Sequence, residues 1–144
     1  MVAKELAAAQ VPVIIHPTDN LPGSFESLAS RADNAAILAA NKVRILISTF
    51  MEPHMMRVLR QEAGNAVAWG LPYDEAIRAI TSNVADTYGV EGGRIGAGAR
   101  ADLILWNGDP LELSSRAEAM WIAGKQVELV SRQQALFKKY RTVP

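Results

Sequence analysis

Side chains that can move protons follow two short apolar runs of the sequence. His16 follows the run V-P-V-I-I, and Thr49, Glu52 and His54 follow the run V-R-I-L-I. A carboxylate and an imidazole two residues apart suit general acid–base chemistry or metal binding, so Glu52 and His54 are candidate catalytic residues. The alternative is that both lie in a solvated loop and help to cap the helix that follows.

Three further residues are candidates for substrate binding. His16 could bind through a neutral imidazole, Thr49 could donate a hydrogen bond to a substrate oxyanion, and Arg57 could hold a carboxylate. For His16 the alternative is a hydrogen bond to a neighbouring backbone group, and for Arg57 it is an exposed ion pair. Thr49 has no base beside it in the sequence, so it is not a candidate nucleophile.

The elements that must position these residues are two strands and the helices after them. Both apolar runs, 11–15 and 43–47, have the β-branched character of strands that are buried on both faces of a parallel sheet. Helical periodicity predicts helices over 25–40 and 54–69, and two short helices follow over 72–88. Strand–helix repeated twice is the pattern of a parallel α/β sheet, in which the loops after the strands share one edge.

Composition excludes several classes of function. Fifteen basic residues balance fifteen acidic ones, so no net charge would attract nucleic acid or an anionic membrane. The chain contains no cysteine, which excludes disulfides and thiolate zinc sites. No apolar run approaches the roughly 18 residues of a membrane span. A small-molecule substrate and a cytoplasmic location are therefore expected, although any N-terminal signal would be missing from a truncated chain.

Three stretches carry a family resemblance. The segment R-I-G-A-G-A-R-A-D-L-I-L-W-N-G-D-P-L (94–111) resembles the carboxy-terminal signature of the amidohydrolase superfamily, and 70–90 resembles the segment that precedes it. V-P-V-I-I-H-P-T-D-N-L-P resembles barrel strand seven and its loop in the imidazolonepropionase-like branch. V-R-I-L-I-S-T-F resembles strand eight. The resemblance extends over almost the whole chain.

This resemblance implies an α/β fold made of the last two βα units of a TIM-like barrel plus the C-terminal strands of a small β-sandwich. The fold would be incomplete in this chain. Residues 1–90 would be the partial barrel segment and residues 91–130 the partial sandwich segment. Residues 131–144 would form a C-terminal helix and tail, with Ser131 and Gln134 as the capping box.

The resemblance also implies metal-dependent hydrolysis of C–N bonds, with zinc or iron in a full-length parent. The one family ligand that should fall in this chain is an aspartate at the end of strand eight, and Phe50 occupies its position. Phenylalanine offers no lone pair to a metal, so no metal ligand and no cofactor are expected in this chain.

Two functions follow as hypotheses. In the first, the chain is the C-terminal fragment of an amidohydrolase-like enzyme that acts on non-peptide C–N bonds, in a cyclic amide or a related substrate. It would be inactive alone, and its partner would be the missing N-terminal part of the parent. An uncapped, mid-pattern helix at the N-terminus favours this hypothesis. In the second, the chain is a non-catalytic α/β module that covers its open sheet edge by associating with other copies of itself.

Overall fold

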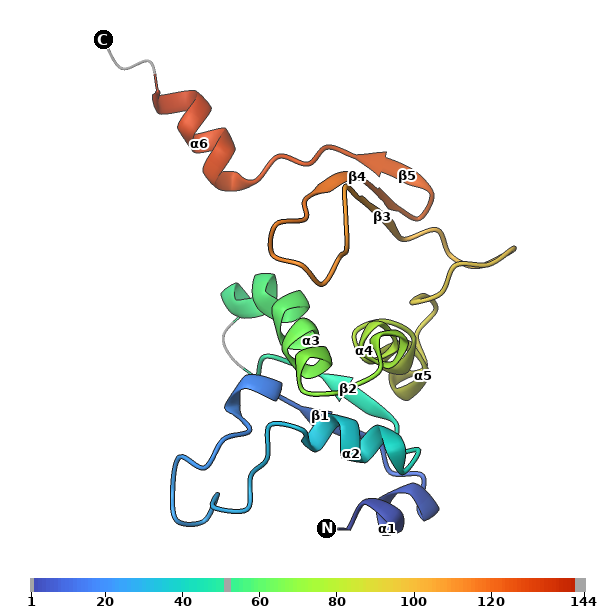
Figure 1. Ribbon diagram of the computed structural model, residues 1–144. Helices are drawn as coiled ribbons and strands as arrows, with labels where there is room; N and C mark the ends of the chain where they lie inside the picture. Colours follow the sequence, from blue (N-terminus) through green and yellow to red (C-terminus); the bar gives the residue numbers. More distant parts are fainter. Residues whose placement is uncertain (1, 51–52, 142–144) are drawn as a thin grey trace.

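A computed structural model describes residues 2–50 and 53–141 of the chain. Two short strands, β1 (Val13–Ile15) and β2 (Ile45–Ile47), pair in parallel, with Val13 opposite Ile45 and Ile15 opposite Ile47. The predicted parallel pairing is therefore confirmed, although each strand is two residues shorter than its apolar run. Figure 1 shows this pair surrounded by helices in the lower part of the molecule.

Helices occupy most of the sequence from the N-terminus to Tyr88. They are α1 (Ala3–Ala8), the 3-10 turn Pro17–Asp19, α2 (Asn34–Ala40), the 3-10 segment Pro53–Val58, α3 (Leu59–Ala68), α4 (Tyr73–Ala79) and α5 (Ser82–Tyr88). Gly89 ends α5 with a left-handed backbone, φ 65°, which glycine adopts without a steric penalty. The predicted helix at 54–69 is thus correct in place but begins as a 3-10 segment.

The helix predicted over 25–40 is wrong in its first half, because α2 begins only at Asn34. The preceding segment makes turns that are held by side chains. The Ser27 hydroxyl accepts hydrogen bonds from the amides of Gly23 (3.0 Å) and Ser24 (2.8 Å). Such local side-chain bonds offer the backbone an alternative to helical hydrogen bonding. As a result Phe25, which was expected to lie in this helix, is 87% exposed.

The apolar core lies between the parallel strands and the helices packed on them. Its members are small or aliphatic: Ala3, Ile15, Ala35, Leu38, Val43, Ile45, Ile47, Ala63, Ala66, Leu71, Ala76, Ala79 and Leu111. The many alanines let helices approach the strands closely. The core therefore holds α3 and α4 at fixed positions beside β2, and this matters for the site.

A side chain occupies the edge of β2 that faces away from β1. Toward β1, the carbonyl of Arg44 accepts from Val13 N (2.9 Å) and the amide of Ser48 donates to Ile15 O (2.9 Å). The carbonyl of Ile45 accepts a hydrogen bond from Nδ2 of Asn83 on α5, at 2.9 Å. Backbone groups of successive residues alternate between the two edges of a strand, so this amide sits where a further strand would pair.

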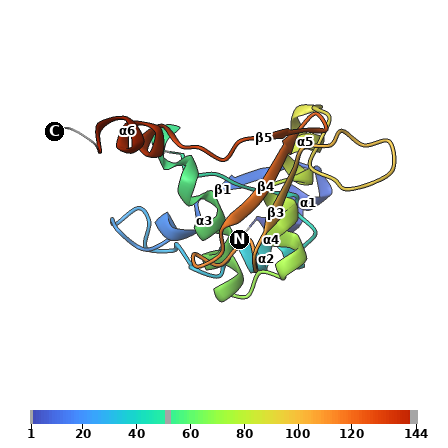
Figure 2. The same ribbon diagram turned by 90° about the horizontal axis from the view of Figure 1, so that it is seen from above.

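The C-terminal third forms a second, antiparallel sheet of β3 (Leu103–Trp106), β4 (Ala117–Ile122) and β5 (Lys125–Val127). β4 and β5 form a hairpin whose turn is centred on Ala123 and Gly124, both with positive φ. Figures 1 and 2 show this sheet stacked over α3 and α4, with α6 (Arg132–Tyr140) projecting beyond it. The predicted capping box at the start of α6 is present. The division at residues 90 and 130 stays a prediction.

The loop between β3 and β4 attaches this second sheet to the helices. Leu111 inserts into the core and is only 8% exposed. Its carbonyl oxygen lies 3.0 Å from the position that a Cβ on Gly64 would take, so α3 and the loop are in close contact there. The Arg60 guanidinium lies 4.3 Å from the ring centroid of Trp106 and donates to the carbonyl of Pro110 at 2.6 Å. Arg60 therefore joins α3 to the end of β3 and to the first part of the loop.

Two aspartates of the carboxy-terminal signature have structural roles. Asp102 accepts hydrogen bonds from Ala123 N and Arg100 Nε, each at 2.6 Å, and these bonds, the first above all, lower the pKa of its carboxyl group. Asp109 accepts from the Tyr73 hydroxyl at 2.7 Å and from Leu111 N at 2.8 Å. Both residues therefore stabilise turns, away from the parallel strands.

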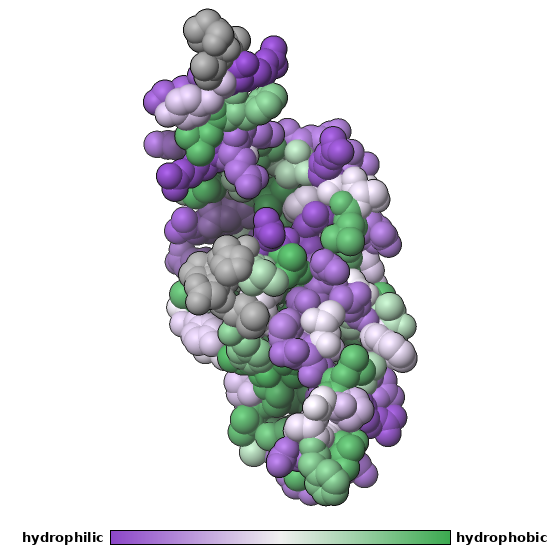
Figure 3. All heavy atoms as spheres, turned by 90° about the vertical axis from the view of Figure 1, so that its left-hand side faces the viewer, coloured by the Kyte–Doolittle hydropathy of each residue, from purple (hydrophilic) through white to green (hydrophobic). Residues whose placement is uncertain are grey.

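The surface carries many apolar side chains among polar ones, as Figure 3 shows for one face. Ile14, on the strand face opposite the core, is 41% exposed, and the largest exposed fractions include those of Ile95 and Phe25. In the part of the chain that the structure describes, no helix is long and apolar enough to cross a membrane.

Candidate functional site

His16 and residues 48–50 lie side by side at the carboxyl ends of β1 and β2. The Ser48 amide donates to the carbonyl of Ile15, which fixes the two strand ends against each other. The ring centroids of His16 and Phe50 are 6.3 Å apart, with the ring planes at 80°. The parallel strands thus bring together residues that are more than 30 positions apart in the sequence, as the strand pattern predicts.

A buried carboxylate lies behind His16. Glu62 on α3 is 4% exposed, and the Thr18 hydroxyl lies 2.9 Å from both of its carboxylate oxygens. The Thr18 amide also donates to Glu62 Oε2, at 3.1 Å. A carboxylate buried to this degree is stable only when hydrogen bonds replace its water, and Thr18 supplies them.

The His16 ring lies between two carboxylates of different exposure. Its Nε2 is 3.5 Å from Glu62 Oε2 and 3.4 Å from Thr18 Oγ1, while its Nδ1 is 3.3 Å from Asp19 Oδ2. The side chain of Asp19 is 82% exposed, against 5% for Glu62. Nδ1 is shielded from solvent and makes no hydrogen bond with any described residue, since the approach of Asp19 is poorly aligned. Nε2 therefore lies close to polar partners, whereas Nδ1 has no hydrogen-bond partner among the described residues.

Phe50 has an unusual backbone. Its φ is 47°, in the left-handed region that non-glycine residues and especially bulky ones avoid. Its amide donates to the Ser48 hydroxyl at 3.2 Å, and the side chain, 62% exposed, lies edge-to-face against His16. Backbone strain of this kind is commonest at functional sites. Here it directs an apolar ring, in place of an acid, toward the imidazole.

The other candidate residues have different surroundings. Thr49 is buried, at 6% exposure, and lines a mainly apolar pocket of about 260 Å³ beside β2. Arg57 is exposed on the 3-10 segment that precedes α3. Glu52 and the side chain of His54 lie outside the part of the chain that the structure describes, so their catalytic roles stay predictions.

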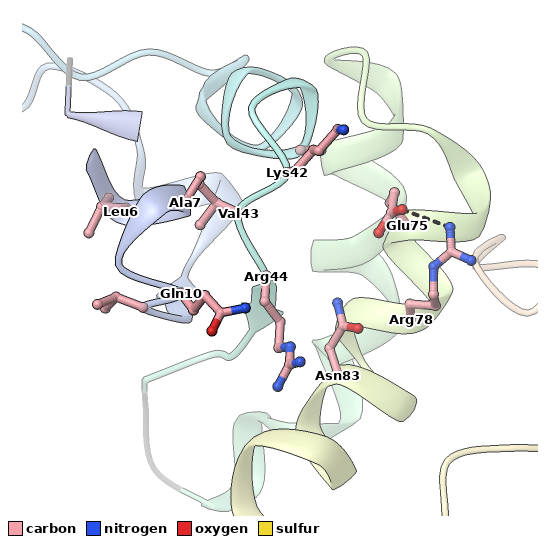
Figure 4. Close-up of a pocket in the computed structure, with 11 residues that line it drawn as sticks. Leu6, Ala7, Gln10, Lys42, Val43, Arg44, Glu75, Arg78 and Asn83 are labelled. Carbon is pink, nitrogen blue, oxygen red and sulfur yellow. Dashed lines mark hydrogen bonds and ion pairs between the residues drawn. The ribbon is translucent and has the colours of Figure 1, made fainter. Parts of the chain in front are cut away.

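A larger pocket, about 730 Å³, lies at the opposite, amino ends of β1 and β2. Figure 4 shows Gln10, Arg44 and Asn83 directed toward the same space, with Arg78 paired to Glu75 at 2.7 Å. This lining contains no imidazole. The imidazole of His16 lies at the carboxyl end instead.

Comparison with known proteins accounts for this arrangement. Residues 28–128, well over half of the chain, match the profile of the amidohydrolase family. The chain belongs to the amidohydrolase family. The amidohydrolases that it resembles are longer, and the chain covers only part of each of them.

Two curated amidohydrolase relatives share local sequence identity with the chain. Amidohydrolase tasK of Hapsidospora irregularis is 38% identical over 65 residues, which are 44% of this chain and 7% of that protein. The imidazolonepropionase of Acidiphilium cryptum (strain JF-5) is 38% identical over 99 residues, or 64% of this chain and 24% of that protein.

Solved amidohydrolase structures confirm the mixed α/β fold. An amidohydrolase from Thermotoga maritima MSB8 superposes with a TM-score of 0.78 and 25% identity, over 88% of this chain and 34% of that chain. A prolidase solved with N-methylphosphonate-L-proline superposes with a TM-score of 0.64 and 23% identity, over 88% of this chain and 37% of that chain. The chain thus spans about a third of the solved amidohydrolases that it matches.

The described residues do not fit the metal centre that amidohydrolases typically hold. No group of three or more His, Cys, Asp or Glu residues within 2–50 and 53–141 is placed to hold a metal ion. Phe50, at the expected ligand position, has no donor atom. The carboxylate nearest to His16 Nε2, that of Glu62, is already occupied by Thr18.

Sequence reasoning missed two members of this candidate site, Thr18 and Glu62. The signal for Glu62 was present, because it lies three residues after Leu59 and one before Ala63, on the stripe that α3 buries. A carboxylate on the buried stripe of a helix must have a polar partner. Thr18 offered no comparable signal, since a threonine in a polar loop is common.

Proposed function

We propose that this chain is the C-terminal part of an amidohydrolase that hydrolyses a non-peptide C–N bond, in a cyclic amide or a related substrate. In this proposal β1 and β2 are the last two strands of a TIM-like barrel, and β3–β5 belong to its small β-sandwich. The remainder of the barrel would come from the N-terminal part of the parent protein.

The observation that carries the proposal is the pairing of β1 with β2. Parallel pairing places His16 next to residues 48–50 at the carboxyl ends, and this is the face where barrel enzymes assemble their active sites. The strained backbone of Phe50 lies at the same place. A histidine, a buried carboxylate and a residue with a left-handed backbone thus lie together at this edge.

The substrate class rests on the relatives. The curated relative that covers most of this chain is an imidazolonepropionase, and a solved relative holds a proline analogue. We therefore expect a small ring-containing substrate with an amide-like carbon. Thr49 and Arg57 are the proposed substrate-binding residues, for an oxygen and a carboxylate respectively.

The reaction requires a water molecule to attack the amide-like carbon and a proton to reach the leaving nitrogen. A zinc or iron ion in the whole protein would need ligands from outside the described residues. Residues of this chain would contribute proton transfer and substrate contacts from its two strand ends. With one strand pair out of a barrel, the chain alone is expected to be inactive.

The test compares the whole protein with this 144-residue chain. Both are assayed against an imidazolone, a five-membered cyclic amide and an acyl-proline dipeptide. We expect hydrolysis of the ring substrates by the whole protein and none by the chain. Absence of hydrolysis of both the imidazolone and the cyclic amide by the whole protein would contradict the proposal. The intact mass of the protein from its native source decides which of the two forms is produced.

A second candidate is a non-catalytic module that associates with other copies of itself. It is favoured by the exposed apolar side chains and by Ile14, which is 41% exposed on the sheet face opposite the core. Light scattering of the 144-residue chain at micromolar concentration tests it. A monodisperse monomer would exclude this candidate.

A further inference from the structure

The contacts among His16, Thr18 and Glu62 indicate which nitrogen of the neutral imidazole carries the hydrogen. Thr18 has a single hydroxyl proton and two neighbours that could accept it. Both Glu62 oxygens lie at 2.9 Å, whereas His16 Nε2 lies at 3.4 Å. The charged and closer acceptor takes the proton, because charge-assisted hydrogen bonds are the stronger ones. The Thr18 hydroxyl then presents only lone pairs to His16.

Nε2 of His16 is consequently surrounded by acceptors. These are the lone pairs of Thr18 and the Oε2 atom of Glu62, at 3.5 Å. An unprotonated Nε2 would place a third set of lone pairs against them, so Nε2 must carry a hydrogen. In the neutral ring Nδ1 is then the atom with the lone pair.

Asp19 favours the other tautomer of His16, with the hydrogen on Nδ1, but its effect is weaker than that of Glu62. Its Oδ2 is 3.3 Å from Nδ1 and would favour a hydrogen there, yet its side chain is 82% exposed while that of Glu62 is 5% exposed. Water screens an exposed charge far more than a buried one. Glu62 therefore decides the neutral tautomer, and Asp19 is placed to stabilise Nδ1 once that atom has taken up a proton. Nδ1 is shielded from solvent in this arrangement, so its use as a base requires the exposed Asp19 side chain to move aside.

We propose that Glu62 is a positioning residue that holds His16 in the Nε2–H tautomer, so that Nδ1 is the proton-accepting atom of this site. The role as base rests on the proposed hydrolase function; the tautomer does not. Nδ1 would take one proton from the attacking water as its oxygen bonds to the amide-like carbon. It would return that proton to the nitrogen as the C–N bond breaks, so the ring ends as it began. The base would thus come from the end of β1, whereas Phe50 lies at the end of β2.

The chain offers a direct test because it contains only two histidines, His16 and His54. Nitrogen-15 labelling of the histidine rings gives two sets of signals, and the variant His54→Gln leaves only those of His16. At a pH where the ring is neutral, we expect the Nε2–H form to exceed the Nδ1–H form about tenfold, as a charge-assisted hydrogen bond predicts. A predominant Nδ1–H form would overturn the proposal.

Two variants test the part that Glu62 plays. Glu62→Leu removes both acceptor oxygens, and Glu62→Gln removes the charge while keeping the size in case the first variant folds poorly. We expect the tenfold preference to fall to about twofold or less. Glu75→Gln is the matched control, since it removes a carboxylate from an ion pair at the other end of the strands. An unchanged preference in folded Glu62 variants would overturn the proposal.

Activity of the whole protein separates this proposal from the proposed function. We expect His16→Asn to lower kcat about 100-fold and Glu62→Gln to alter the pH profile of kcat. Hydrolysis by His16→Asn at the unmodified rate would overturn the role as base while the proposed function stands. If the whole protein hydrolyses no substrate but the tautomer depends on Glu62, the proposed function fails and the positioning role is supported.

Discussion

Arg60 is the residue whose removal should most clearly weaken the junction between α3 and the second sheet. The variant Arg60→Ala loses the guanidinium that lies 4.3 Å from the Trp106 ring centroid and donates at 2.6 Å to the Pro110 carbonyl. A partly exposed cation–π contact contributes about 1 kcal/mol, and a hydrogen bond from a charged group about 1.5 kcal/mol or more. We therefore expect a loss of about 2–3 kcal/mol, a large part of the stability of a domain of this size.

The assay is urea unfolding followed by far-ultraviolet circular dichroism, with the free energy of unfolding from linear extrapolation. Arg57→Ala is the matched control, because Arg57 is exposed one turn earlier in the chain and should cost less than about 0.5 kcal/mol. Arg60→Lys keeps the charge but lacks the planar guanidinium group. It should therefore lower the free energy of unfolding by about half as much as Arg60→Ala.

A double-mutant cycle isolates the aromatic contact. Arg60→Ala and Trp106→Leu are measured singly and together, and we expect a coupling free energy of about 1 kcal/mol. The reasoning is refuted if the coupling is near zero, or if Arg60→Ala costs no more than Arg57→Ala. A coupling near zero would mean that the aromatic contact adds nothing. A cost of Arg60→Ala no larger than that of Arg57→Ala would mean that Leu111 alone attaches the loop to α3.

Two further predictions concern single backbone and side-chain positions. Gly93 has φ 69° and a Cβ there would lie 2.7 Å from the carbonyl carbon of Thr81, so Gly93→Ala should lower the free energy of unfolding by about 2 kcal/mol or more. Gly96→Ala is its control, since nothing lies within 4 Å of the new atom, and a similar cost for both in urea unfolding would contradict the argument. Partial desolvation of Tyr73, which is 40% exposed, followed by the hydrogen bond to Asp109, raises its pKa to about 12. The stability from this contact should be complete below about pH 10, the ordinary tyrosine value, and be lost as the pH rises through about 12. A titration of phenolate absorbance in the unmodified chain and in Tyr73→Phe measures it, and a Tyr73 signal at the ordinary value would show the contact to be absent.

Sequence patterns predicted the elements where burial and local chemistry agree. The two parallel strands are rich in β-branched residues, and β2 is buried along its whole length, while α6 begins at a capping box made by Ser131 and Gln134. The helix expected over 25–40 does not form in its first half, although the apolar spacing there is that of a helix. The reason is that the Ser27 hydroxyl binds the backbone amides of Gly23 and Ser24.

The proximity of His16 to residues 48–50 was predicted, but the side chains that contact the His16 ring from other elements were not. Parallel strands end at the same edge of a sheet, and this rule alone was enough to predict that His16 lies beside residues 48–50. It could not supply Glu62, which comes from a helix 46 positions after His16 and is directed to it by the packing of α3 on β2. Contacts of that kind depend on how a helix is rotated about its axis, and a helical stripe locates such a rotation only approximately.

The Asn83 amide on the outer edge of β2 has a consequence for association. Exposed strand edges recruit other strands indiscriminately and are a common start of aggregation. Here the carbonyl of Ile45 is already engaged at 2.9 Å, so an incoming strand must displace a side chain before it can pair. A weak or misaligned strand gains too little to do so, whereas a well-matched one recovers the lost bond with several of its own. Pairing at this edge is therefore expected to favour strands that are long enough, and fit well enough, to replace the hydrogen bond from Asn83.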